Sequence, residues 1–188
     1  MYTFIVNPNA KTGLGYQVWS SLEAILKEKN VNYQVFFTKY QKHATRLAQK
    51  LTQESGAKTL IVLGGDGTIN EVINGIEDLD GTVLGYIPIG SSNDFARGMG
   101  LSTDPVQALK HILSPEHFTY INIGTAMYAG KTRRFAVSSG LGFDAGVCHQ
   151  VYVSKLKKLL NKLHLGKLSY AAVALQQILT MTPLKMTL

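Results

Sequence analysis

The chain has 188 residues, 45% of them hydrophobic, and a formal net charge of +7 at pH 7. These values fit a globular protein with one full hydrophobic core and part of a second, and they exclude a disordered chain. The only cysteine, Cys148, excludes an internal disulfide bond and is typical of a reducing compartment such as the cytoplasm. The start of the chain lacks signal-peptide features, and no run approaches the roughly 20 apolar residues of a membrane span.

The positive charge is concentrated toward the C-terminal end. Residues 1–144 contain 13 Lys or Arg and 12 Asp or Glu, a net +1, whereas residues 145–188 contain six lysines and no acid, a net +6. This asymmetry predicts an anionic partner for the C-terminal part. Because arginine is absent there and only Tyr152 and Tyr170 could stack on bases, an anionic membrane surface is favoured over nucleic acid.

Short apolar runs alternate with segments of helical spacing in the first two thirds of the chain. Four strands are predicted, at residues 2–7, 33–38, 59–63 and 82–88. Helices are predicted around the apolar residues at 19–26, 44–51 and 72–76. In the second helix, Lys42, Arg46 and Lys50 are interpreted as a solvated face. Strands that alternate with helices at this spacing predict an α/β fold with a doubly wound parallel sheet.

The central motif is the segment from Leu60 to Glu71, with the sequence LIVLGGDGTINE. Apolar residues end in three glycines around one acid, and a helix-like run follows. Glycines 64, 65 and 67 can accept positive φ angles, and they let backbone N–H groups approach a ligand closely. With the positive end of the following helix, these groups predict a phosphate site. A glycine-rich turn with a capping Asp66 is the structural alternative.

Asp66 is not expected to bind phosphate directly, because like charges repel. Its place in the motif is explained by a metal ion or a substrate hydroxyl between the two groups. Two better-known phosphate loops do not fit, since Ser91 stands where a Walker loop needs lysine and Val18 where a dinucleotide fingerprint needs glycine. The phosphate chemistry is therefore of another kind.

Polar residues also follow the other predicted strands. In a doubly wound sheet the loops after the strands meet along the carboxyl edge. One cleft is therefore expected to collect Asn7, Thr38, Asp66, Thr68, Ser91, Asn93 and Asp94. Taken singly, Asn93 and Asp94 favour helix caps over ligands. Taken together with the glycine motif, the set favours a nucleotide site.

Three segments in chain order resemble the diacylglycerol kinase catalytic-domain family, especially its soluble bacterial lipid kinases. They are Asn7-Pro8 through Gly13, the glycine motif at 64–71, and the segment PIGSSNDFAR at 88–97. The family usually has Thr and then a small residue where this chain has Ser91-Ser92, and the serine keeps a phosphate-binding hydroxyl. The resemblance implies a fold shared with NAD kinases and phosphofructokinases.

The resemblance also implies an enzyme that uses ATP and Mg²⁺ to phosphorylate a hydroxyl of diacylglycerol or a related lipid. The residues expected to contact ATP are Asn7, Pro8, Gly13, Thr38, Gly64, Gly65, Asp66, Gly67, Thr68, Ile69, Asn70 and Ser91. Asp66 is also expected to be catalytic and to bind the metal. Contacts with the lipid substrate are expected from Asn93, Asp94, Arg97 and Asp144, although a helix cap explains Asp144 about as well.

After about residue 118 the pattern changes to short strand candidates at 120–123, 126–129 and 134–138. A nucleotide-binding domain at 1–118 is therefore expected, followed at 119–188 by the start of a β-rich lipid-binding domain. The family's second domain is a β-sandwich, and its Asp-Gly-Glu-type segment, which supplies the proposed base, has no match here. The chain is thus expected to be the N-terminal portion of a longer kinase. By itself it is expected to bind nucleotide weakly and to transfer phosphate poorly or not at all.

Residues 152–163 predict an amphipathic helix with Lys155, Lys157, Lys158 and Lys162 outside its apolar arc. These lysines are either solvated or in contact with lipid headgroups. The second reading gives a cytoplasmic protein peripheral to an anionic membrane, and exposed apolar surface would favour a homodimer. Two alternatives stay open: a NAD kinase-like enzyme with a soluble acceptor, which the segment 93–97 opposes, and a non-catalytic nucleotide-binding fragment, which the missing base favours.

Overall fold

The structure is a computed structural model that describes residues 1–53, 58–140, 145–149, 173–176 and 178. The chain divides into two compact units, residues 1–137 and residues 138–188, and each is described by itself. In the second unit, Val147 and Val173 are buried in one small apolar cluster. Among the helices that the structure describes, none is long and apolar enough to cross a membrane.

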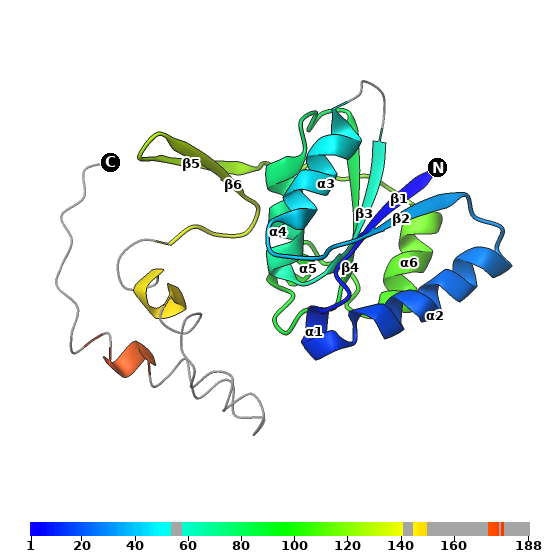
Figure 1. Cartoon of the computed structure of the whole chain (residues 1–188), viewed down its shortest axis with the longest axis horizontal. Coiled ribbons are helices and arrows are strands. Elements are labelled where there is room, and N and C mark those ends of the chain that lie inside the picture. Colours follow the sequence, from blue (N-terminus) through cyan, green and yellow to red (C-terminus); the bar gives the residue numbers. More distant parts are fainter. Residues whose placement is uncertain (54–57, 141–144, 150–172, 177, 179–188) are drawn as a thin grey trace. The chain divides into compact units, whose positions relative to one another are not determined.

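The first unit contains all the elements that are labelled in Figure 1. In chain order they are β1 (Tyr2–Val6), α1 (Ala10–Gly13), α2 (Gly15–Glu28), β2 (Tyr33–Phe37), α3 (His43–Thr52), β3 (Lys58–Gly64), α4 (Asp66–Gly75), β4 (Thr82–Pro88), α5 (Asp94–Gly98), α6 (Pro105–Leu113), β5 (Gly124–Tyr128) and β6 (Lys131–Phe135). The first four strands lie within one residue of their predicted ends.

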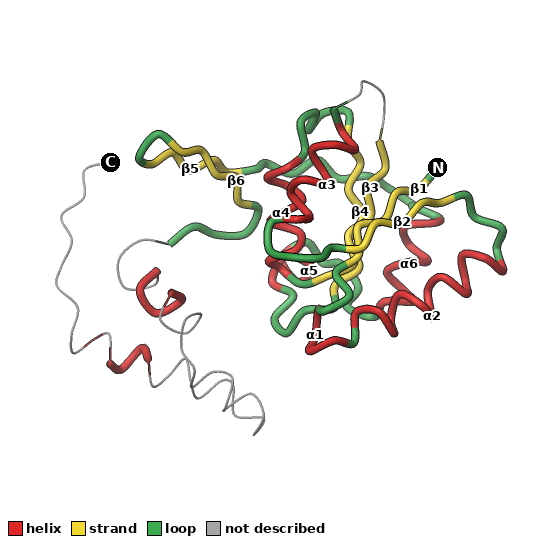
Figure 2. The backbone as a smooth tube through the Cα atoms, in the orientation of Figure 1, coloured by secondary structure: helices red, strands yellow, loops and turns green. Residues whose placement is uncertain are grey.

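Strands β1 to β4 form one parallel sheet in the order β2-β1-β3-β4 (Figure 2). Val6 at the end of β1 pairs with Phe37 of β2 and with Leu63 of β3. Gly64 of β3 pairs with Pro88 of β4. All four strands therefore end at the same edge of the sheet, and the loops that follow them are neighbours. The doubly wound parallel sheet expected from the sequence is confirmed.

Helices cover both faces of this sheet, α2 and α6 on one face and α3, α4 and α5 on the other (Figure 1). Successive residues of a strand point to opposite faces. In β3, Ile61 and Leu63 pack in the core with α2 and α6, whereas Leu60 and Val62 pack in the core with α3, α4 and α5. Because both faces are buried, β3 is a continuous apolar run and not an alternating one.

Strands β5 and β6 form an antiparallel hairpin. Ala129 and Gly130 at its turn have φ angles of 46° and 71°, which is the left-handed pair that a tight hairpin turn requires. The two strands lie slightly earlier than the expected ranges 126–129 and 134–138, because the turn fixes where each strand ends.

The prediction of a strand at residues 120–123 is wrong. These residues form no strand, and Tyr120 is 97% exposed. Ile121 and Ile123 pack instead against the core that α3, α4 and α5 cover. Their alternation with polar residues therefore reflects burial against this core, without a neighbouring strand in the described part of the chain.

Arg134 of β6 joins the hairpin to the end of α4. Asn74 Nδ2 donates to the Arg134 carbonyl at 2.9 Å, and the Arg134 N–H donates to Asn74 Oδ1 at 2.8 Å. The guanidinium also donates to the carbonyls of Ile73 at 3.1 Å and Ile76 at 2.5 Å. A cation is favourable here because the last carbonyls of a helix carry partial negative charge. The hairpin thus packs against α4 within the first unit. The start of a second domain at residue 119 stays a prediction.

We expect Asn74→Ala to loosen the hairpin without disturbing the sheet. The change leaves the part-buried N–H and carbonyl of Arg134 without partners, which costs about 1–3 kcal/mol. Hydrogen exchange should become faster in β5 and β6 and stay unchanged in β1 to β4. Asn32→Ala, at an exposed position, is the control, and equal protection of the hairpin in both variants would show that Asn74 does not hold it.

Candidate functional site

The glycine turn, residues 64–67, connects β3 to α4 at the carboxyl edge of the sheet. Gly65 is at the N-cap with φ −94° and ψ −177°, and Asp66 is the first residue of α4. The glycines of this turn do not use the positive φ angles that glycine can accept. Among the described residues, the glycines with positive φ are Gly13, Gly100 and Gly130.

Close packing, and not backbone conformation, explains two of these glycines. A Cβ on Gly64 would lie 2.6 Å from Thr68 Cβ, and a Cβ on Gly65 would lie 3.2 Å from Gly90 Cα. At Gly67, by contrast, a Cβ would meet no described atom within 4 Å. Packing within the protein therefore does not require glycine at position 67, whereas a ligand that approaches the backbone closely would require it.

The start of α4 presents backbone N–H groups to the carboxyl edge. The N–H groups of Thr68 and Ile69 donate to the Gly65 carbonyl at 2.9 Å and 3.2 Å. Those of Asp66 and Gly67 come earlier, where no preceding helical turn supplies an acceptor. Together with the partial positive charge of the helix end, they form a suitable site for an anion such as phosphate.

Asn7, just after β1, connects its own loop to α4. Its Nδ2 donates to Thr68 Oγ1 at 3.0 Å, and its Oδ1 accepts the Asn9 N–H at 3.0 Å. Thr68 is only 7% exposed, so this bond fixes its hydroxyl beside the turn. Gly15 keeps α2 close to the same loop, because a Cβ there would collide with the Asn7 carbonyl oxygen. The sequence order predicts both Asn7 and Thr68 at this edge but not the bond between them.

Asp66 faces the loop that follows β4. Its Oδ1 accepts the Phe95 N–H at 3.1 Å, which leaves Oδ2 without a hydrogen bond to another described residue. Mg²⁺ is commonly held by one or two carboxylates together with phosphate oxygens, and Asp66 fits that pattern. In the described part of the chain, no group of three or more His, Cys, Asp or Glu could hold a metal by itself. A metal at Asp66 would therefore depend on the oxygen atoms of a bound phosphate.

Tyr86 of β4, which the sequence reasoning missed, supports the glycine turn. Its hydroxyl donates to the Gly64 carbonyl at 3.1 Å, and its ring contacts Phe95 with centroids 5.6 Å apart. Burial, and to a smaller extent the negative charge of Asp66, raises the pKa of Tyr86. The phenol therefore stays protonated and donates this bond at neutral pH. The sequence contained one signal for this role: Tyr86 lies in an apolar strand that is predicted to be buried, and a buried tyrosine hydroxyl needs a hydrogen-bond partner.

Asn93 organises the loop between β4 and α5. It has φ 54°, and its Oδ1 accepts the Gly90 N–H at 2.7 Å. Asn93 is the N-cap residue of α5, as expected, but its side chain makes no capping bond to that helix and stabilises the loop instead. Ser91, Asp94 and Arg97 are exposed along this loop and α5, where a ligand can reach them.

A shallow cavity of about 180 Å³ lies beside α5. It is lined by Asp94, Phe95, Gly98, Met99, Ala136 and Val137. Its wall is mostly apolar, with one exposed carboxylate. Asp144, the remaining predicted substrate contact, and the lysine-rich segment at 152–163 lie outside the described residues.

The other predicted ATP contacts lie at or near the same edge. Thr38, just past β2, is half-buried, and its N–H is bonded to β1. Asn70 is bonded through its side chain to the next turn of α4. Ile69 is 2% exposed, so only its backbone could meet a ligand. Pro8 is half-buried, and Gly13 is exposed at the end of α1 with φ 97°.

Comparison with protein families assigns these segments to one family. The model of the diacylglycerol kinase catalytic domain matches residues 1–126, which include the glycine turn and the loops bonded to it. The chain belongs to this family. The resemblance inferred from the sequence motifs is thereby confirmed.

Relatives of this diacylglycerol kinase family member are known from several bacteria. "Putative lipid kinase YtlR" of Bacillus subtilis (strain 168) is 34% identical over 186 residues, which cover 96% of this chain and 60% of the relative. A diacylglycerol kinase of Staphylococcus aureus (strain Newman) is 37% identical over 142 residues, which cover 74% of this chain and 43% of the relative.

Solved structures show the same likeness. The crystal structure of a diacylglycerol kinase from Bacillus anthracis str. Sterne matches with a TM-score of 0.58 and 29% identity, over 70% of this chain and 48% of that one. The parallel sheet and its flanking helices agree with the NAD kinase-like fold that the family resemblance implies. The chain thus spans about half the length of the relatives it matches.

Proposed function

We propose that this chain binds ATP with Mg²⁺ and transfers the γ-phosphoryl group to a hydroxyl of diacylglycerol or a related lipid. The observation that carries the proposal is the joining of three loops at one sheet edge. The Asn7–Thr68 bond connects the loop after β1 to α4, and the bond between Asp66 and the Phe95 N–H connects α4 to the loop after β4. Membership in the diacylglycerol kinase family supports the choice of acceptor.

The phosphates of ATP would lie against the start of α4. The N–H groups of Asp66 and Gly67 would donate to phosphate oxygens there. Thr68 Oγ1 already accepts a bond from Asn7, so its own proton is available to donate to a phosphate oxygen. The rest of the nucleotide would contact Thr38, Asn70, Ser91 and the loop from Asn7 to Gly13.

Asp66 would act at the reacting end of the nucleotide. Mg²⁺, when bound, supplies positive charge that neutralises the phosphates during transfer. Asp66 Oδ2 would hold the ion or accept the proton of the lipid hydroxyl, whose oxygen bonds to the γ-phosphorus as the bond to ADP breaks. Such transfer depends on positioning and charge neutralisation more than on covalent catalysis.

The cavity beside α5 is the proposed entry of the acceptor. Phe95 connects it to the reacting end, because its N–H binds Asp66 and the residue is part of the cavity wall. A lipid hydroxyl in this cavity would therefore lie close to the Asp66 carboxylate. Asn93, Asp94 and Arg97 are the proposed contacts with the lipid headgroup in the described part of the chain, and Asp144 is proposed with them.

A peripheral position on the cytoplasmic side of an anionic membrane would bring such an acceptor within reach. The support is the excess of lysine in residues 145–188, which hold six lysines and no acid. A homodimer is proposed as well, because Met127 and Tyr128 on the hairpin are 82% and 56% exposed and would gain from burial.

Two assays on this chain separate binding from transfer. Calorimetric titration with ATP and Mg²⁺ should show binding, and γ-labelled ATP should label diacylglycerol in mixed micelles above the level given by Asp66→Asn. Transfer to NAD in place of lipid would identify a NAD kinase-like enzyme. ATP binding without transfer to either acceptor would identify a nucleotide-binding module. Either outcome, transfer to NAD in place of lipid or binding without transfer, would contradict the proposal.

A further inference from the structure

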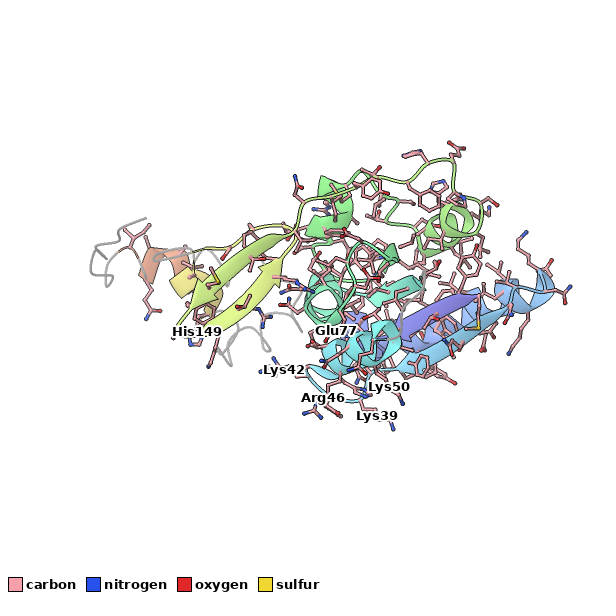
Figure 3. The ribbon with its side chains drawn as sticks, turned by 90° about the horizontal axis from the view of Figure 1, so that it is seen from above. Lys39, Lys42, Arg46, Lys50, Glu77 and His149 are labelled. Carbon is pink, nitrogen blue, oxygen red and sulfur yellow. The ribbon has the colours of Figure 1, made fainter. Side chains whose placement is uncertain are left out.

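The outer side of α3 carries a group of cations that the site does not use. The group, here named the cationic stripe, consists of Lys39, Lys42, Arg46 and Lys50, and all four are exposed. Figure 3 shows their side chains gathered on one side of the molecule. Residues 38–53 contain these four cations and no acid.

The stripe follows from the spacing of residues along the helix. Lys42, Arg46 and Lys50 recur every four residues, so they lie one above the other on one side of α3 and its N-cap. Ala44 and Ala48, which are out of step by two residues, are 1% and 0% exposed and face the core. The helix therefore has one apolar side against the sheet and one cationic side turned away from it.

The described acids that bond to α3 or its N-cap do not pair with the cations of the stripe. Glu77 accepts the Gln49 side-chain N–H at 2.7 Å, and Glu71 accepts the Lys42 backbone N–H at 2.9 Å. Within the described ranges, none of the four cations forms an ion pair. Like charges four residues apart on a helix repel one another, so the stripe lowers stability unless an anion lies against it.

Tyr40 places an aromatic ring among these cations. Arg46 Nη1 donates to the Tyr40 hydroxyl at 3.1 Å, and Arg46 Cζ lies 5.7 Å from the ring centroid. His43 stacks on the ring with centroids 4.6 Å apart, and Tyr40 remains 53% exposed. A half-exposed tyrosine beside lysine and arginine is typical of residues at a membrane interface, where the ring lies at headgroup level and the cations meet lipid phosphates.

We propose that the cationic stripe binds the anionic phospholipid headgroups of a membrane surface. The inference rests on the proposed function, because a kinase for a bilayer lipid acts at such a surface. Lys39 directly follows Thr38 at the carboxyl edge, so the stripe begins beside the loops of the site and continues along α3. Its binding is electrostatic, and salt weakens it.

Cosedimentation with vesicles of phosphatidylcholine, with and without phosphatidylglycerol, tests the proposal. Replacing Lys42, Arg46 and Lys50 together with Gln should lower the affinity for the anionic vesicles by about 100-fold, as the loss of three headgroup contacts predicts. The matched control removes the same charge from the opposite side of the sheet. It replaces three exposed lysines on or next to α2 and α6 with Gln: Lys27, Lys29 and Lys110.

The control variant should bind anionic vesicles like the unaltered chain. The stripe variant should unfold at a temperature no lower than that chain, because the repulsion between like charges is removed. An equal loss of vesicle affinity in the two variants would show that only the net charge of the chain matters, and this would overturn the proposal. Binding of the unaltered chain that ignores phosphatidylglycerol or added salt would overturn it too, as would a stripe variant that loses binding to an RNA oligonucleotide but keeps its binding to anionic vesicles. Vesicle binding requires no phosphate transfer, so a stripe that binds while no lipid is phosphorylated overturns only the proposed function.

Discussion

Asp66→Asn should lower phosphate transfer to lipid by at least about 100-fold while the chain stays folded. Asparagine keeps an oxygen that can accept the Phe95 N–H, so the loop after β4 stays attached to α4. The negative charge that would hold Mg²⁺ or take the proton is lost. ATP affinity measured without metal should not fall, because a repulsive charge near the phosphates is removed.

A matched substitution separates this effect from a general one. Asp104 caps α6 by accepting the Gln107 N–H at 2.8 Å, and it belongs to no proposed site. Asp104→Asn therefore makes the same chemical change with a hydrogen bond preserved, and it should leave transfer unaltered. Normal turnover with normal Mg²⁺ dependence in Asp66→Asn would remove Asp66 from the mechanism.

Gly64→Ala should lower both stability and ATP affinity. The new Cβ would lie 2.6 Å from Thr68 Cβ, and Thr68 is buried and bonded to Asn7. Relief of this clash should cost about 1–3 kcal/mol in the free energy of unfolding, measured with urea. Displacement of the Thr68 hydroxyl should weaken ATP by about 10-fold, which corresponds to the loss of one hydrogen bond.

The same pair of measurements can contradict this account of the turn. Stability equal to that of the unaltered chain would show that the turn tolerates a side chain against Thr68. Lower stability with unchanged ATP affinity would show that Thr68 supports the fold without meeting the nucleotide.

The sheet and the place of the site could be predicted because both depend on local signals. Buried parallel strands are apolar runs of a typical length, and the residues just after them fall at one edge whatever the details of packing. The segment from Leu60 to Glu71 carries both signals at once, since its strand ends directly in the glycine turn.

The reasons behind individual residues could not be predicted, because they depend on contacts between distant segments. Gly65 has an ordinary φ and is small because Gly90 of another loop lies against it. Asn93 bonds Gly90 and not its own helix. Tyr86 supports the turn through a hydrogen bond from its hydroxyl to the Gly64 carbonyl, and the apolar pattern of its strand does not predict that partner.

At residues 120–123 the alternation of apolar and polar residues predicted a strand that the structure does not contain. Ile121 and Ile123 alternate with polar neighbours as in a strand, yet they pack against a core that helices cover. Alternation reports which side chains are buried, and a strand also needs a partner backbone to bond. That partner is a tertiary property, which the local pattern does not contain.

The central claim is that the backbone of the glycine turn binds the phosphates of ATP, and Gly67→Ala tests it most directly. A Cβ at this position meets no described atom within 4 Å, so the fold should be unaffected, and an added Ala in a helix favours stability slightly. Helical Cβ atoms point toward the helix N-terminus, where the phosphates are proposed to lie.

Calorimetric titration with ATP and Mg²⁺ should therefore give at least about 10-fold weaker binding for Gly67→Ala, because the new methyl group keeps the phosphates from the backbone. Urea unfolding of the same variant should show stability no lower than that of the unaltered chain. ATP affinity equal to that of the unaltered chain, in a variant that is folded, would contradict the claim.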